Sequence, residues 1–137
     1  MVNKKKASGA GFILTNEKYP NKILGLVSHD GSWDLPKGTY DKTDKSLVYC
    51  AIRECYEECG ILVDKNDIIN NSGFSAGKLM VFVAVVNEEP KILKNFKTKI
   101  IEHAGYAWIS TAVFKENTKP FLKEVVKKYE NSLKKKN

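Results

Sequence analysis

The sequence contains no long run of apolar residues. None approaches the roughly eighteen that a helix needs to cross a membrane, so no membrane partner is expected. No apolar signal region follows the lysines at its start. A chain of 137 residues suits one core, and we expect a single domain over residues 1–137 with basic tails at 1–6 and 134–137. The oligomeric state is left open.

Cysteine and histidine are scarce, which limits the zinc and disulfide chemistry open to the chain. The cysteines are Cys50, Cys55 and Cys59, all on one expected helix, and only His29 and His103 could add ligands. A closed zinc site takes four ligands, and an odd number of cysteines on one helix does not make a disulfide framework. We therefore expect reduced, packed thiols and a cytoplasmic, intracellular protein.

The net positive charge of the chain is concentrated at its two ends. The formal net charge is +7, and two lysine runs, 4–6 and 134–136, supply six of these charges, which leaves +1 for the rest. Solvated ends explain this excess more simply than a nucleic-acid patch does. RNA is kept as an alternative partner.

A helix-like run that ends at Gly60 carries the most distinctive chemistry. At about 100° per residue, Glu54, Glu57 and Glu58 fall within roughly a 100° arc, away from the apolar and thiol side chains. Like charges at this spacing repel, and Arg53 is the adjacent cation in the run. Three hard oxygen ligands suit Mg²⁺, with Mn²⁺ as the second choice. The alternative is a solvated acidic face.

The residues around these acids resemble the Nudix box. Residues 53–61 match the second half of that pattern, which runs Arg-Glu, an apolar residue, any residue, Glu-Glu, any residue, Gly and an apolar residue, if Cys55 is accepted as apolar. The first half of the box departs from the family pattern. Fourteen residues separate Gly38 from Arg53, one more than in the family, and Asp44 or Lys45 replaces the isolated Glu. We expect altered loop geometry more than altered catalysis, with Asp44 as an acid near the helix N-terminus.

The resemblance implies an α/β fold, the Nudix α/β/α sandwich in which a mixed β-sheet lies between helices. It also implies an enzyme that hydrolyses phosphoanhydrides. By the same resemblance, Glu54, Glu57 and Glu58 are expected to bind metal together with the backbone carbonyl of Gly38. Arg53 is expected to hold a box Glu in position by a charge-assisted hydrogen bond.

Residues outside the helix complete the expected site. Nudix hydrolases often use a further Glu before the last sheet strand and its Trp, and Glu102 is similar in placement, as a metal ligand or as the general base. His103 is the weaker candidate base. Lys37 is expected beside the polyphosphate, where it would neutralise developing charge, with an exposed loop lysine as the alternative. Trp33 is a candidate for substrate contact, although packing is the simpler role.

These residues lead to one main functional hypothesis and two alternatives. The main hypothesis is Mg²⁺-dependent hydrolysis of a nucleoside polyphosphate, either a dinucleoside polyphosphate or a nucleoside triphosphate, because residues 33–38 resemble the entry of diadenosine tetraphosphate hydrolases. Residues 50–60 also resemble mRNA-decapping Nudix enzymes, so RNA 5′-end hydrolysis is the enzymatic alternative. A nucleotide-binding module with little catalysis is the third reading. The altered box favours it, and the three intact acids count against it.

The remaining pattern predicts the scaffold. Strands are expected at residues 7–14, 23–27, 79–86 and 106–109, an irregular strand or loop at 70–77, and an amphipathic helix at 119–133. The strand at 79–86 is apolar throughout and is therefore expected to be central. The first two strands are expected to pair as a hairpin. Thr43 or Asp44 is expected to cap the box helix, and Gly60 to end it.

Overall fold

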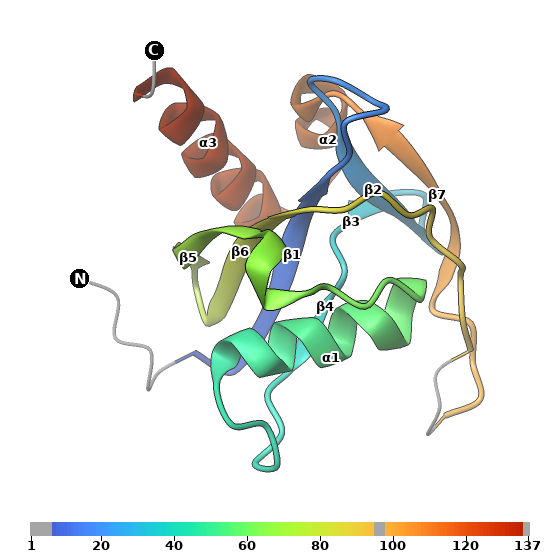
Figure 1. The fold of residues 1–137 in the computed structure, drawn as a ribbon. Helices are drawn as coiled ribbons and strands as arrows, with labels where there is room; N and C mark the ends of the chain where they lie inside the picture. Colours follow the sequence, from blue (N-terminus) through green and yellow to red (C-terminus); the bar gives the residue numbers. More distant parts are fainter. Residues whose placement is uncertain (1–6, 95–97, 136–137) are drawn as a thin grey trace.

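The fold is given by a computed structural model that describes residues 7–94 and 98–135 (Figure 1). The strands are β1 (Gly9–Thr15), β2 (Ile23–Ser28), β3 (Trp33–Asp34), β4 (Lys37–Thr39), β5 (Ile68–Ala76), β6 (Leu79–Val85) and β7 (His103–Ile109). The helices are α1 (Leu47–Cys59), α2 (Thr111–Glu116) and α3 (Pro120–Lys135), with a short 3₁₀ turn at Lys65–Asp67. No helix among the described residues is both long and apolar enough to cross a membrane.

Two sheets form the centre of the molecule. The first has the strand order β4-β1-β6-β5, in which β1 runs parallel to β6 and the other neighbours are antiparallel. The second is antiparallel, with β2 between β3 and β7. The expected mixed sheet is therefore confirmed, and its apolar strand at 79–85 is central, as predicted. Irregular pairing of β5, where Gly73 has a φ of 74°, accounts for the ambiguous pattern of residues 70–77.

Helices cover both faces of the mixed sheet (Figure 1). Side chains alternate along a strand, so even-numbered residues of β1 and β6, such as Phe12 and Phe82, pack against α1. Odd-numbered residues, such as Ile13 and Val81, pack against α2 and α3. Burial on both faces explains why these strands are apolar at nearly every position. The α/β/α sandwich predicted from the resemblance is confirmed.

The expected hairpin of the first two strands is wrong. β1 pairs with β4 and β6, whereas β2 pairs with β3 and β7, so the chain changes sheets between them. The apolar runs correctly predicted burial of both strands. They could not predict pairing, because strand partners here are chosen by contacts far apart in the chain.

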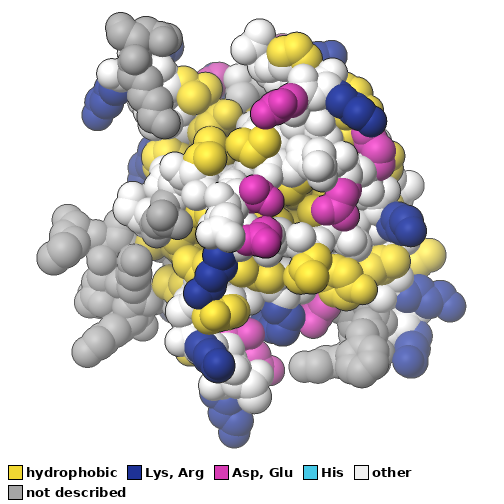
Figure 2. Space-filling view, in the orientation of Figure 1, with side chains coloured by type: hydrophobic (Ala, Val, Ile, Leu, Met, Phe, Trp, Pro, Cys, Tyr) yellow, Lys and Arg dark blue, Asp and Glu magenta, His cyan; other side chains and the backbone are white. Residues whose placement is uncertain are grey.

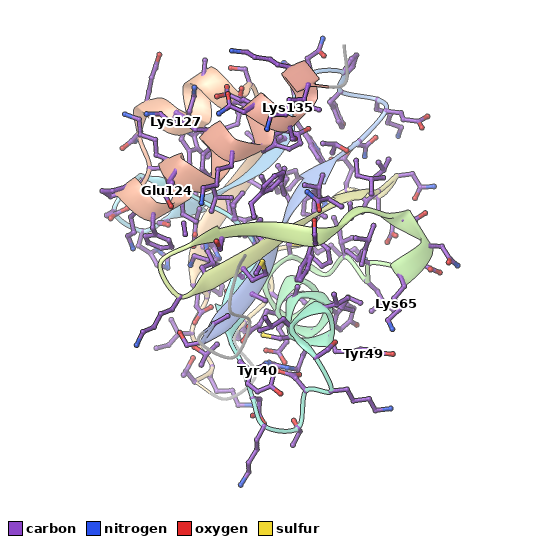
Figure 3. The ribbon with its side chains drawn as sticks, turned by 90° about the vertical axis from the view of Figure 1, so that its left-hand side faces the viewer. Tyr40, Tyr49, Lys65, Glu124, Lys127 and Lys135 are labelled. Carbon is purple, nitrogen blue, oxygen red and sulfur yellow. The ribbon has the colours of Figure 1, made fainter. Side chains whose placement is uncertain are left out.

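Both ends of α1 and the polar side of α3 complete the scaffold. The N-cap of α1 is Ser46, whose Oγ accepts a hydrogen bond from the amide of Tyr49, and not Thr43 or Asp44 as predicted. Gly60 ends the helix with a φ of 72°, as predicted. In Figure 3, α3 points Glu124, Lys127 and Lys135 away from the sheet. This helix extends to Lys135, so part of the basic tail expected at 134–137 is helical. The tail at 1–6 lies outside the described residues.

Candidate active site

Arg53 is the centre of a cluster of three carboxylates. It donates two hydrogen bonds to Asp44, from Nε to Oδ1 and from Nη2 to Oδ2, both at 2.9 Å. Its Nη1 lies 3.3 Å from Glu54 Oε2 and from both Glu57 oxygens. Its Nη2 also donates to the carbonyl of Thr39 at 3.0 Å. The expected hydrogen bond from Arg53 to a box Glu is present, and the same side chain also ties helix α1 to the loop before it.

Asp44 shows how the unusual first half of the box is accommodated. Its side chain is only 5% exposed, and it accepts a further hydrogen bond from the amide of Asp41 at 2.9 Å. The hydrogen bonds from Arg53 outweigh burial and lower the pKa of Asp44 below its ordinary value. Asp44 therefore stays charged as a partner of Arg53, instead of serving as an acid in the first turn of the helix.

Gly38 and Glu54 are in close contact, which explains why position 38 needs glycine. A Cβ placed on Gly38 would lie 2.0 Å from Cδ of Glu54 and within 2.3 Å of both its oxygens. The carbonyl of Gly38, the expected metal ligand, lies 3.8 Å from Sγ of Cys50. Burial raises the pKa of Glu54, and the negative charges of Glu57 and Glu102 add to this effect, although Arg53 opposes it.

Glu58 points to the other side of the same turn. Its Oε1 accepts a hydrogen bond from the backbone amide of Lys37 at 3.1 Å. Burial raises the pKa of Glu58 to about 9, and the nearby charges of Asp34 and Glu102 raise it further, against the effects of Lys37. Glu102 itself is exposed on the segment before β7 and acts electrostatically on both Glu54 and Glu58. Glu102 thus lies within electrostatic reach of the acidic turn, and its role as metal ligand or general base stays a prediction.

Asp34 was not predicted as a site residue, yet it occupies the middle of a second cluster. It accepts hydrogen bonds from the amide of Leu35 and from His103 Nε2, each at 2.9 Å, and pairs with Lys37 Nζ at 3.2 Å. Burial alone would raise the pKa of Asp34. The hydrogen bond from His103 and the charge of Lys37 outweigh it, so the pKa is lowered. The only sequence signal for this role was an acid three positions before Lys37.

The acidic residues are adjacent but do not form a preformed metal cage. Among the described residues, no group of three or more His, Cys, Asp or Glu side chains is arranged to hold a metal ion. The reason is visible in the contacts: Glu54 and Glu57 turn to Arg53, while Glu58 turns to the amide of Lys37. The donor set still fits a hard divalent cation, because it offers several carboxylate oxygens, including those of the partly buried Glu54 and Glu58.

A pocket of about 480 Å³ adjoins strand β4. It is lined by Lys37, Gly38 and Thr39 on one side and by Lys78 and the 37% exposed Phe121 on another. Trp33 lies elsewhere. Its ring packs on Gly25, whose Cβ would meet it at 2.8 Å, and against the core under α3. Trp33 thus has the packing role considered from the sequence, and its contact with substrate stays a prediction.

Known proteins share both the sequence pattern and the fold. The NUDIX domain family matches residues 5–129. An uncharacterised 17.7 kDa protein of Enterobacteria phage T4 is 30% identical over 79 residues, which span 55% of this chain and 51% of the phage protein. The chain thus matches only about half the length of that relative.

Solved structures with low sequence identity have the same fold. The Ap4A hydrolase of C. elegans, in a binary complex, has a TM-score of 0.69 at 19% identity, over 91% of this chain and 97% of that one. The Nudix hydrolase RenU of M. smegmatis has a TM-score of 0.71 at 13% identity, over 95% of this chain and 87% of that one. The MutT protein of Methanosarcina mazei Go1 has a TM-score of 0.63 at 24% identity, over 92% of this chain and 94% of that one. With its family match covering most of its length, the chain belongs to the Nudix hydrolase family.

Proposed function

We propose that this Nudix hydrolase cleaves a phosphoanhydride bond in a nucleoside polyphosphate, with Mg²⁺ or Mn²⁺ held by Glu54, Glu57 and Glu58. The observation that supports this most directly is the packing of Glu54 against Gly38, which holds a box carboxylate against strand β4, whose residues also line the pocket. Glu102 and the Gly38 carbonyl are the further candidate ligands. When bound, the cation would neutralise phosphate charge and lower the pKa of a coordinated water.

The protein's own groups have separate tasks in this proposal. Lys37, at the pocket wall, attracts the polyphosphate and offsets charge that develops as the bond breaks. Arg53 orients Glu54 and Glu57 through the contacts described above. In this proposal Glu102 accepts a proton from the attacking water. No covalent enzyme intermediate is needed, because water can attack phosphorus directly and a phosphate-bearing group leaves.

The pocket suits the nucleoside part of such a substrate. Phe121 offers an exposed ring for stacking with a base, and Lys78 adds a second positive charge beside Lys37. The Ap4A hydrolase of similar fold is named for a dinucleoside polyphosphate, which makes this class the first to test.

The decisive experiment measures product release from dinucleoside polyphosphates and nucleoside triphosphates, with and without Mg²⁺. We expect turnover only with a divalent cation, and a loss of about 100-fold or more in Glu57→Gln and in Glu58→Gln. Glu124→Gln, an exposed acid on α3, is the matched control and should retain full activity. Turnover that persists without divalent cations, or in both box variants, would refute the proposal.

The same panel separates the two alternatives. Capped and 5′-triphosphorylated RNA should be included, because RNA binding would weaken steeply as salt is added. On the face in Figure 2, Lys and Arg side chains are interspersed with acidic, hydrophobic and other side chains and form no continuous patch, so this face gives RNA no specific support. A folded protein that binds nucleotide with Mg²⁺ but cleaves none of the panel would be a binding module.

A further inference from the structure

The Asp34 carboxylate connects three segments that meet at the site. We propose that Asp34 is a positioning residue for the hydrolysis, holding Lys37 on one oxygen and His103, the neighbour of Glu102, on the other. This inference rests on the proposed function and extends it. Asp34 lies outside the Nudix box, and its role would be to set the spacing between the groups that face phosphate and those that face water.

The contacts of Asp34 are divided between its two oxygens. Oδ1 accepts from the amide of Leu35 at 2.9 Å and pairs with Lys37 Nζ at 3.2 Å, and Oδ2 bonds Nε2 of His103 at 2.9 Å. The side chains are largely shielded from water, with exposures of 16% for Asp34, 5% for His103 and 23% for Lys37. Such shielding limits competition from water and fixes all three groups relative to one another.

The bond to His103 holds a part of the sheet that is otherwise irregular. β2 lies between β3 and β7, and its register with β7 shifts between Val27 and Ser28, just where Ser28 faces His103. The Asp34–His103 bond therefore joins the two outer strands across β2 at the point where backbone pairing is disturbed. Glu102 directly precedes His103, so this bond anchors the end of the segment that carries Glu102.

The bond to Lys37 reaches the acidic turn from the other side. Lys37 is one of the residues that line the pocket, and its amide donates to Oε1 of Glu58. A shift of Asp34 would thus move the Lys37 ammonium, which pairs with it at 3.2 Å, and disturb the partner of Glu58 at the same time. The Asp34 carboxylate thus connects Lys37, the group proposed to face phosphate, with the segment that carries Glu102, the group proposed to face the attacking water.

The chemistry of the pair also decides which ring nitrogen of His103 carries the shared hydrogen. An ionised carboxylate only accepts hydrogen bonds, so Nε2 of His103 must carry the hydrogen that it shares with Asp34. In a neutral imidazole, Nδ1 is then the acceptor. In an Asp34→Asn variant whose oxygen stays on Leu35 and Lys37, the new amide NH₂ would face Nε2. The ring would then have to move its hydrogen to Nδ1.

The first test compares Asp34→Asn with Asp30→Asn, an exposed Asp on the preceding turn, in otherwise intact protein. We expect kcat/KM to fall by about 10- to 100-fold in Asp34→Asn, the range seen when partners of site residues are removed. The loss should appear in KM through Lys37 and in kcat through Glu102. Asp30→Asn should match the wild type, and circular dichroism should show both variants folded.

The second test uses ¹H–¹⁵N correlation NMR to determine which ring nitrogen of His103 carries hydrogen. It does not depend on turnover. We expect the Nε2–H tautomer in the wild type and the Nδ1–H tautomer in Asp34→Asn. His103→Gln, whose amide can donate to Asp34 as the ring does, should keep most of the activity, whereas His103→Leu should lose it. An inactive His103→Gln would show that the ring itself reacts and would overturn the positioning role.

Further results would also overturn the inference. One is full kcat/KM in folded Asp34→Asn, and the other is an Nδ1–H tautomer in the wild type. If the wild type cleaves no nucleotide, the proposed function fails, and with it the catalytic part of this inference. An active wild type with an active Asp34→Asn would instead remove the inference and leave the function intact.

Discussion

Two ion clusters flank the acidic turn of α1, and they have opposite designs. In one, a single cation, Arg53, is contacted by three carboxylates. In the other, a single carboxylate, Asp34, is contacted by an ammonium, an amide and an imidazole. Both place groups at the same site. They differ in what remains when the central residue is removed.

The free-energy cost of replacing Arg53 or Asp34 depends on the partners that are left behind. Without Arg53, the carboxylate of Asp44 stays in a position that is 5% exposed and lacks its cation. A buried charge without a partner is strongly destabilising. When Asp34 becomes Asn, the Leu35 amide keeps an acceptor, Lys37 can turn to water, and a neutral ring can change tautomer. The Arg53 cluster should therefore support the fold as well as the site, whereas the Asp34 cluster should mainly set geometry.

Arg53→Ala gives the largest expected effect and tests this contrast directly. We expect a loss of about 3 kcal/mol in the free energy of unfolding, at the low end for buried pairs because Arg53 is 31% exposed. Activity should fall too, since Glu54 and Glu57 lose their common partner. Urea denaturation of this variant beside Asp34→Asn measures the difference. If Asp34→Asn proves as unstable as Arg53→Ala, the two clusters do not differ in the way described.

Gly38→Ala should have the next largest effect, confined to activity. The added methyl would displace the Glu54 carboxylate, which a Cβ at position 38 would meet at 2.0 Å. A misplacement of about 1 Å at a catalytic centre can cost about 100-fold in rate, and we expect at least that loss in kcat. Gly105→Ala, where a Cβ meets nothing within 4 Å and φ is not in the left-handed region, is the matched control and should leave kcat unchanged. Nearly normal kcat in Gly38→Ala would mean that Glu54 can serve from another position.

The sequence predicted the local features of the site well. The spacing of Arg53, Glu54, Glu57 and Glu58 lies within one helix, where a fixed geometry converts spacing into position. Gly60 was recognised as the helix end because a left-handed C-cap strongly favours glycine. Ser46 was missed as the N-cap, since Thr43 and Asp44 are equally good caps in isolation. Only the contact with Arg53 shows that Asp44 is engaged elsewhere.

The long-range features could not be predicted in the same way. Asp34 and His103 are 69 positions apart, and no periodicity in the sequence records that they meet. The pairing of β1 with β6 and of β2 with β7 is equally non-local, which is why the hairpin expectation was wrong. Family resemblance supplied the box, whose residues are contiguous. It did not supply the second cluster, whose members come from separate strands.

Asp44→Asn gives the smallest of these effects and probes the Arg53 cluster through pH. Arg53 holds the pKa of Asp44 below its ordinary value of 3.8. A carboxyl whose pKa is lowered in the folded state adds stability above its ordinary pKa, and this stability is lost as the pH falls through the folded value. At neutral pH we expect Asp44→Asn to cost about 2 kcal/mol, less than Arg53→Ala, because Arg53 keeps Glu54 and Glu57 as partners and stays partly solvated.

Measuring the same difference in stability at several pH values separates the effect of the Asp44 charge from that of its packing and hydrogen bonding. Below its folded pKa, Asp44 in the wild type is protonated and resembles Asn, so the stability gap between the two proteins should close as the pH drops below about 4. Urea unfolding at a series of pH values, with exposed Asp67→Asn as the control, measures the gap. A gap that stays constant down to acid would show that Asp44 acts by packing and hydrogen bonding alone. The contribution assigned to the charge pair of Arg53 with Asp44 would then be wrong, although the contacts of Arg53 with the box acids would stand.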